Sequence, residues 1–109
     1  MFVLTIDQRD SRRGADLVPA ALDDLTELGG DDWAARPERT AGDEMQMATT
    51  DAALALRVLL TSTRSGAWSV GVGVGAVEAP LPRSVRAGRG AAFIAARDAV
   101  DRAKTTALR

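Results

Sequence analysis

The 109-residue chain contains no cysteine and no histidine. Without cysteine there are no disulfides and no thiolate chemistry, and the lack of both residues excludes the usual Cys/His zinc sites and a histidine general base. Acidic and basic residues are nearly balanced, 15 against 14, so the net charge of −1 predicts no direct binding of nucleic acid or of an anionic membrane. Any catalysis by this chain must therefore use carboxylates, basic groups or a bound hard cation.

Long hydrophobic runs are absent as well. The apolar run in residues 1–6 is far too short for a signal sequence or a membrane span, and Asp7 interrupts it. The hydrophobic content of 46% nevertheless supports a real core, and 109 residues fit one domain better than two. We therefore expect a single domain over residues 1–109, in a cytoplasmic protein with no membrane partner.

The first half of the chain shows the signals of a strand, a helix and a hairpin, in that order. Apolar and other side chains alternate over residues 2–7, as in a strand with two different faces. Asp16 is expected to cap a helix over residues 17–28. Residues 31–50 contain two short extended segments on either side of Gly42, which predicts a β-hairpin.

The second half predicts a helix, a strand and a last helix. Thr50 is expected to cap the helix over residues 51–63. Residues 68–75, WSVGVGVG, have valines on one face and glycines on the other, so the glycine face would allow a nucleotide or another backbone to approach closely. The last helix is expected over residues 90–106. The leucines expected to reach the core from the first of these helices are Leu56, Leu59 and Leu60.

This order of elements describes an α+β fold of the split βαβ, or ferredoxin-like, kind. The expected structure is an antiparallel βαββαβ sheet with helices on one face and an additional C-terminal helix. Its first and third strands are expected to be neighbours in the centre of the sheet. That arrangement would bring Asp7, at the end of the first strand, close to the hairpin tip at residues 42–44.

The predicted hairpin is similar to one found in nucleotide cyclases. Residues 39–45, R-T-A-G-D-E-M, resemble the R-x-G-G-D-E-F hairpin of diguanylate cyclases, with residues 42–44 matching its G-D-E. In those enzymes a second acid ends the first strand, which is the position of Asp7. The segment A-R-D-A-V-D-R-A-K resembles their A-D-x-A-L-Y-x-A-K helix, and places Lys104 at the lysine that faces the substrate phosphates. The resemblance implies a GGDEF-like, nucleotide-cyclase-like core.

A closer resemblance is to the SatD family of bacterial proteins, which has the same cyclase-like core. Asp7, Ser11 and Arg12 reproduce its D-x-x-x-S-R signature, and G-D-E-M-Q resembles its G-D-E-F-Q. Residues 90–97, G-A-A-F-I-A-A-R, resemble its G-P-A-F-x-x-A-R. The motifs stand in the family's order and span nearly the whole chain.

These resemblances imply a regulatory domain that binds a nucleoside triphosphate with Mg²⁺, with Mn²⁺ as a substitute, and leave residual nucleotidyl cyclase activity open. Magnesium prefers hard oxygen ligands, typically one or two carboxylates together with phosphates and waters. Bound metal would assist a ribose hydroxyl that attacks an α-phosphorus. A homodimer is also implied, because such cyclases complete their site between two copies, and the glycine-lined sheet face offers a surface for it. The implied metal ligands and catalytic residues are Asp7, Asp43 and Glu44, and the implied cofactor-binding residues are Ser11, Arg12 and Lys104.

Each implied site residue also has a plain structural explanation. Acids at a hairpin tip are often solvated turn residues, and an acid at a strand end often caps the following loop. The alternative function is therefore a catalytically inert interaction, or dimerisation, module that keeps the cyclase-like fold. A ferredoxin-like RNA-binding domain is a third hypothesis, weakened because the outer positions of the first and third strands lack stacking aromatic residues.

Overall fold

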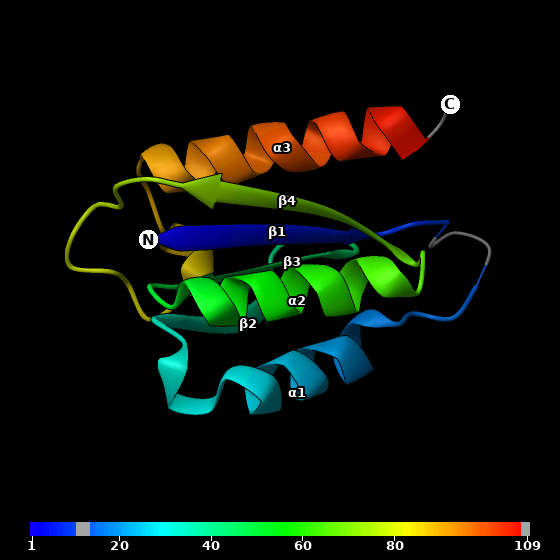
Figure 1. Cartoon of the computed structure of the whole chain (residues 1–109), viewed down its shortest axis with the longest axis horizontal. Coiled ribbons are helices and arrows are strands. Elements are labelled where there is room, and N and C mark those ends of the chain that lie inside the picture. Colours follow the sequence, from blue (N-terminus) through cyan, green and yellow to red (C-terminus); the bar gives the residue numbers. More distant parts are fainter. Residues whose placement is uncertain (11–13, 108–109) are drawn as a thin grey trace.

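The computed structural model describes residues 1–10 and 14–107, and within them the predicted order of strands and helices is confirmed (Figure 1). The strands are β1 (Phe2–Gln8), β2 (Ala35–Arg39), β3 (Glu44–Thr49) and β4 (Trp68–Val74). The helices are α1 (Val18–Gly29), α2 (Ala52–Arg64) and α3 (Ala91–Ala107), with short 3-10 turns at Gly30–Asp32 and Val85–Ala87. None of the described helices is long and apolar enough to cross a bilayer.

The four strands form one antiparallel sheet in the order β2-β3-β1-β4. β1 and β3 are therefore neighbours in the centre of the sheet, as the sequence predicted. The register is regular along β1, where Phe2 lies opposite Thr49 of β3 and Val74 of β4. The chain is thus a small α+β protein with an antiparallel sheet and a C-terminal helix.

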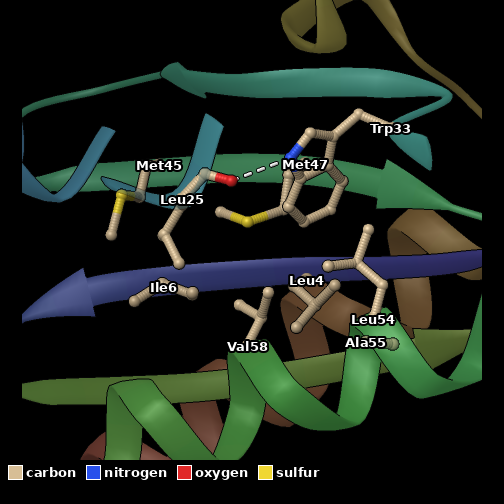
Figure 2. Packing of buried hydrophobic residues seen from close by; sticks show 9 residues of the cluster. All are labelled: Leu4, Ile6, Leu25, Trp33, Met45, Met47, Leu54, Ala55 and Val58. Atoms are coloured by element: carbon tan, nitrogen blue, oxygen red, sulfur yellow. Dashed lines mark hydrogen bonds between the residues drawn. The ribbon is translucent and has the colours of Figure 1, made fainter. Parts of the chain in front are cut away.

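The two faces of the sheet carry separate apolar clusters. Leu4 and Ile6 of β1 pack with Leu25 of α1 and Val58 of α2, so α1 and α2 share one face (Figure 2). Val3, on the opposite face of β1, belongs to a second cluster that includes Ala92, Phe93 and Ala96 of α3. The C-terminal helix, α3, therefore covers the face that α1 and α2 leave open, and the central strands are buried on both sides.

Trp33 holds the end of α1 over the first cluster. Its indole Nε1 donates a hydrogen bond to the carbonyl of Leu25 at 2.9 Å, drawn in Figure 2. Gly29 lies directly against the indole, and a Cβ added at this position would be only 2.2 Å from Nε1. The close approach of the ring leaves room for glycine alone.

The predicted helix caps are wrong. α2 is capped by Asp51 and not by Thr50, because the Asp51 carboxylate accepts hydrogen bonds from two first-turn N–H groups at 2.9 and 3.2 Å. α1 has Leu17 at its N-cap position, and Asp16, one residue earlier, accepts a hydrogen bond from Val18 N at 3.1 Å. Thr50 and Asp51 are both residue types that cap helices well. The sequence alone does not show which of them has the backbone conformation of an N-cap residue.

The exposed face of α2 also differs from the prediction. Leu56 and Leu60 were expected in the core, but their exposed fractions are 54% and 52%. Only Leu59 of the three predicted leucines is partly buried. A rotation of about 100° per residue puts Leu56 and Leu60 on the side of the helix away from the sheet. The residues that reach the core are Leu54, Ala55, Val58 and Ser62.

The glycine face of β4 is not an open surface. A Cβ at Gly71 would lie 2.2 Å from the backbone nitrogen of Val100, and one at Gly73 would lie 2.1 Å from the carbonyl oxygen of Ala92. Close approach of another backbone is confirmed, and that backbone is α3 of the same chain. The expectation that this face receives a nucleotide or a second copy is wrong, because α3 fills it.

Candidate functional site

Asp7 and Glu44 lie opposite each other at one end of the sheet. They form the last register pair of β1 and β3, so their side chains leave the same face of the sheet. Gln8 N donates a hydrogen bond to the carbonyl of Asp43 at 3.1 Å, which joins the end of β1 to the hairpin. The prediction that Asp7 lies close to the hairpin tip is confirmed.

A tight turn produces this position of Glu44. Gly42 has a φ of 53°, a left-handed conformation that glycine adopts without steric cost. Glu44 N donates to the carbonyl of Ala41, and Thr40 N donates to the carbonyl of Glu44, each at 2.9 Å. The hairpin therefore returns directly into β3, with Glu44 as the first residue of that strand.

Two cations of α3 lie over the two acids. Lys104 Nζ is 2.5 Å from Asp7 Oδ2, and Arg97 Nη1 is 2.5 Å from Glu44 Oε1. A spacing of seven residues is close to two helical turns, so both cations leave the same side of α3. Arg97 was part of a recognised motif but was not assigned to the site. Its spacing from Lys104 is the signal that could have identified it.

The acids are much more buried than the cations. The side chains of Glu44 and Asp7 are 10% and 17% exposed, whereas those of Arg97 and Lys104 are 43% and 47% exposed. Thr40 Oγ1 donates a further, short hydrogen bond to Glu44 Oε2. Each acid is thus held by the sheet, while each cation reaches it from the surface.

The hydrogen bonds and charges of this group shift its proton affinities. Burial alone would raise the pKa of Glu44, but hydrogen bonds from Arg97 and Thr40, together with the charges of Arg97 and Lys104, lower that pKa below its usual 4.5. The hydrogen bond to Asp7 raises the pKa of Lys104 above its usual 10.5, against the opposing effect of burial. By these directions Glu44 is ionised and Lys104 is protonated at neutral pH.

Not all of the predicted site residues join this group. Among the described residues, no set of three or more acids, histidines or cysteines is close enough to hold a metal ion, so Asp43 is not gathered with Asp7 and Glu44. Asp43 is partly exposed in the hairpin turn. Ser11 and Arg12 lie outside the described residues.

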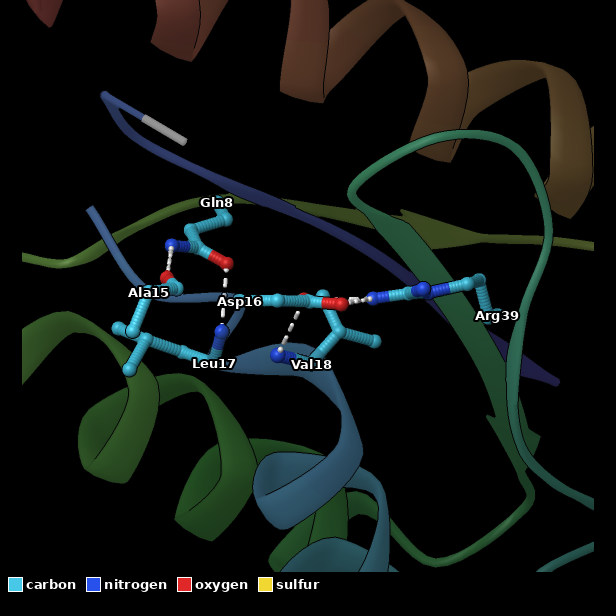
Figure 3. Close-up of polar contacts among 6 residues, drawn as sticks. All are labelled: Gln8, Ala15, Asp16, Leu17, Val18 and Arg39. Atoms are coloured by element: carbon cyan, nitrogen blue, oxygen red, sulfur yellow. Dashed lines mark hydrogen bonds and ion pairs between the residues drawn. The ribbon is translucent and has the colours of Figure 1, made fainter. Parts of the chain in front are cut away.

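A second polar cluster closes the loop between β1 and α1. Gln8 is nearly buried, and its Nε2 donates to the carbonyl of Ala15 at 2.9 Å. Its Oε1 accepts a hydrogen bond from Leu17 N, also at 2.9 Å (Figure 3). The Gln8 side chain therefore joins the end of β1 to the two residues Ala15 and Leu17, just before α1.

Arg39, the first residue of the cyclase-like hairpin motif, belongs to this second cluster. Its Nη2 lies 2.6 Å from both carboxylate oxygens of Asp16 (Figure 3). The hydrogen bond from Arg39, and then the one from Val18 N, lower the pKa of Asp16. The Nε of Arg39 is buried and has no hydrogen-bond partner among the described residues. Arg39 thus fastens β2 to the start of α1 and takes no part in the Asp7 and Glu44 group.

Arg97 is also reachable from a surface groove next to the first half of α3. The groove is bordered by the loop before α3 and by the first two turns of that helix. Its wall includes Phe93, Ile94 and Arg97 from α3, and Gly88 and Arg89 from the loop. Solvent therefore reaches the guanidinium that pairs with Glu44.

No family model, no curated protein and no solved structure matches this chain. The likeness to the SatD family and to nucleotide cyclases therefore rests on the quoted motifs. The geometry of the Asp7 and Glu44 group is the remaining basis for assigning a function.

Proposed function

We propose that this chain is a cyclase-like regulatory domain that binds a nucleoside triphosphate together with Mg²⁺ at the Asp7 and Glu44 group. The observation that carries this proposal is the pair of nearly buried carboxylates on adjacent central strands, with two long cationic side chains directly over them. The strand order β2-β3-β1-β4, with α1 and α2 on one face, supports the ferredoxin-like, cyclase-like topology that such a site requires.

The donor set fits magnesium. Protein sites for Mg²⁺ usually supply only one or two carboxylates, and the phosphates of the substrate and waters complete the coordination. Asp7 and Glu44 provide two such carboxylates, so a preformed cage of three acids is not needed. Asp43, at the adjoining turn, is proposed as a further oxygen donor. The metal would supply positive charge that neutralises the phosphates.

The two cations are suited to phosphate binding. Lys104 and Arg97 are about half exposed, and both have long flexible side chains. In the proposed complex they leave the carboxylates, which the metal then neutralises, and hydrogen-bond to the phosphate oxygens. This exchange replaces every ion pair that it breaks, so no buried charge is left without a partner.

A second function is favoured by the same ion pairs. With Lys104 on Asp7 and Arg97 on Glu44, the acids are already neutralised without a metal or nucleotide. The group would then serve only to fasten α3 to the sheet, and the chain would be a catalytically inert interaction module. This candidate predicts that metal and nucleotide have no effect on the chain.

Calorimetric titration with ATP and with GTP, at fixed Mg²⁺ and again with Mg²⁺ removed by a chelator, separates the two functions. The proposal expects binding that requires the metal and is lost in Asp7→Asn and in Lys104→Gln. Arg102→Gln, an exposed cation two residues before Lys104 on the same helix, is the matched control and should bind as the wild type does. Absence of binding up to millimolar nucleotide would leave the interaction module as the function.

A further inference from the structure

The first half of α3 borders a groove of the size of a small-molecule site. One wall is α3 itself, and the other is the loop over residues 75–90, which leaves the end of β4 and leads into α3 (Figure 1). The groove has a volume of about 610 Å³, within the range of about 300–1,000 Å³ for small-molecule sites. It is separate from the glycine face of β4, which α3 fills. The groove therefore has room for a ligand of nucleoside size.

The loop wall of the groove is held in place by hydrogen bonds to the rest of the chain. Glu38 of β2 accepts hydrogen bonds from Ser84 Oγ at 2.8 Å and from Val85 N at 3.0 Å. At the base of the loop, Glu78 N donates to the carbonyl of Arg89 at 2.7 Å. A wall that is already ordered loses little conformational entropy when a ligand binds.

The surface of the groove is mainly apolar. Phe93 is nearly buried, because Gly88 packs on its ring, and a Cβ added at Gly88 would be 2.1 Å from the ring. Ile94 is instead 65% exposed, so water covers an apolar side chain at this point. A flat, uncharged group that covers Ile94 would gain by removing this surface from water.

The two ends of the groove differ in charge. Glu78 and Arg89 lie near each other at the start of α3, so opposite charges are present at that end. Arg97 lies about two helical turns further along α3, where it pairs with Glu44. The groove therefore runs from an end of balanced charge to a cation of the Asp7 and Glu44 group.

Lys104 continues the cationic side of α3 beyond the groove. It lies seven residues after Arg97, about 10 Å along the helix axis, and it pairs with Asp7. A ligand that lies along α3 would thus meet an apolar surface first and then two cations. A nucleoside triphosphate has this distribution of charge, with an uncharged base at one end and the phosphates at the other.

We propose that the groove is the nucleoside subsite of the nucleotide site, with the base against Ile94, the α-phosphate at Arg97 and the γ-phosphate toward Lys104. This inference rests on the proposed function, because it concerns the same triphosphate. The two can be tested separately, since inorganic tripolyphosphate has the phosphates of the ligand and lacks the nucleoside.

Calorimetric titration with ATP, GTP and inorganic tripolyphosphate, each with Mg²⁺, measures what the nucleoside contributes. Each nucleotide should bind about tenfold more tightly than tripolyphosphate, or better, because covering an apolar side chain of this size gives at least such a factor. Ile94→Ser should remove most of this advantage and leave tripolyphosphate binding unchanged. Leu60→Ser is the matched control, because Leu60 is similarly exposed but lies on α2.

A second variant blocks the groove without touching its apolar wall. Ala91 lines the groove and is exposed at the first position of α3, so Ala91→Trp should reduce nucleotide affinity to that of tripolyphosphate. Ala52→Trp, at the exposed first position of α2, is its control. Lys104→Gln should weaken all three ligands, because Lys104 is assigned to the phosphates. Thermal unfolding confirms that each variant is folded before affinities are compared.

Photo-cross-linking with 8-azido-ATP locates the base, which carries the reactive azide. Trypsin cleaves after Arg89 and Arg97, so residues 90–97 form one peptide that contains Ile94. This peptide should carry the label, and an excess of ATP should suppress it. Peptide 58–64, which contains the exposed Leu60, should stay unlabelled.

The possible failures are distinguishable. Nucleotides that bind no more tightly than tripolyphosphate, an advantage that neither Ile94→Ser nor Ala91→Trp reduces, or a label absent from peptide 90–97 would overturn the subsite and leave the proposed function standing. If neither tripolyphosphate nor nucleotide binds, the proposed function and the subsite are both overturned.

Discussion

Removing the positive charge of Arg97 should destabilise the protein in a strongly pH-dependent way. Arg97→Met keeps most of the aliphatic side chain but leaves the Glu44 carboxylate, which is 10% exposed, with Thr40 as its remaining hydrogen-bond partner in this group. A hydrogen bond to a charged group contributes about 1.5–3 kcal/mol. Because Arg97 is 43% exposed, and solvent weakens an ion pair of that kind, we expect a loss of about 1.5 kcal/mol in the free energy of unfolding at pH 7.

The pH dependence follows from the direction of the Glu44 pKa shift. Its pKa in the folded protein is lowered from the usual 4.5, so the ionised carboxylate contributes stability above pH 4.5, and this contribution is lost as the pH falls through the lowered pKa. Burial opposes this shift, and the hydrogen bond from Arg97 is the largest of the effects that lower the pKa of Glu44. The cost of Arg97→Met should therefore be full at pH 7 and shrink as the pH falls below 4.5 toward the lowered pKa of Glu44.

Urea unfolding of the wild type and Arg97→Met at pH 7 and pH 3 measures this difference. Arg102→Met is the control, since Arg102 is an exposed arginine of the same helix, and it should change stability little at either pH. A loss for Arg97→Met that is equal at both pH values, or no larger than the loss for Arg102→Met, would refute the reasoning.

Three further predictions concern the packing and charges that place the site. Gly71→Ala should cost about 1–3 kcal/mol of stability, because its Cβ would lie 2.2 Å from a backbone nitrogen of α3, whereas Gly14→Ala, with nothing within 4 Å, should cost little; urea unfolding compares them. Asp51→Ala should lose about 1 kcal/mol by removing the N-cap of α2, and Thr50→Ala should be nearly neutral in the same assay. Lys104→Met should lower stability at pH 7 but not well above pH 10.5, because the raised pKa means that the contribution of Lys104 is present below pH 10.5 and lost as the pH rises through the raised value.

Local alternation predicted the sheet well. The two-residue period in residues 2–7 and the turn at Gly42 were enough to place β1, β2 and β3, and the antiparallel order then brought Asp7 beside Glu44. The alternation is visible although both faces of β1 are buried, because one face carries Leu4 and Ile6 and the other carries Thr5 and Asp7.

What covers each face could not be read from the sequence. The glycines of β4 signalled a close approach, but periodicity does not say whether the approaching group is a ligand, another copy or the chain itself. The answer depends on α3, whose small residues match those glycines only once the helix is docked. In the same way, the buried positions of α2 are occupied by Leu54, Ala55, Val58 and Ser62, so residue type alone could not exclude Leu56 and Leu60 from the core.

The candidate site was only half predictable for the same reason. Its acids lie on adjacent strands, where the register fixes their distance, and the sequence anticipated both. Their cations come from α3, and the pairing of Arg97 with Glu44 depends on the tilt and rotation of a helix that packs on the far side of the sheet. A contact between a helix and a strand far apart in the chain has no local signal beyond the spacing of residues on the helix.

α3 is the element on which the proposed properties of this chain depend, because its sides differ chemically. Arg97 and Lys104 lie on the side that faces the acids, and small residues fit the glycines of β4. If ion pairing alone fastened α3, release of the cations to a nucleotide would also release the helix. The glycine contacts hold it by shape, independently of charge, so the cations can exchange partners while α3 stays docked on the sheet.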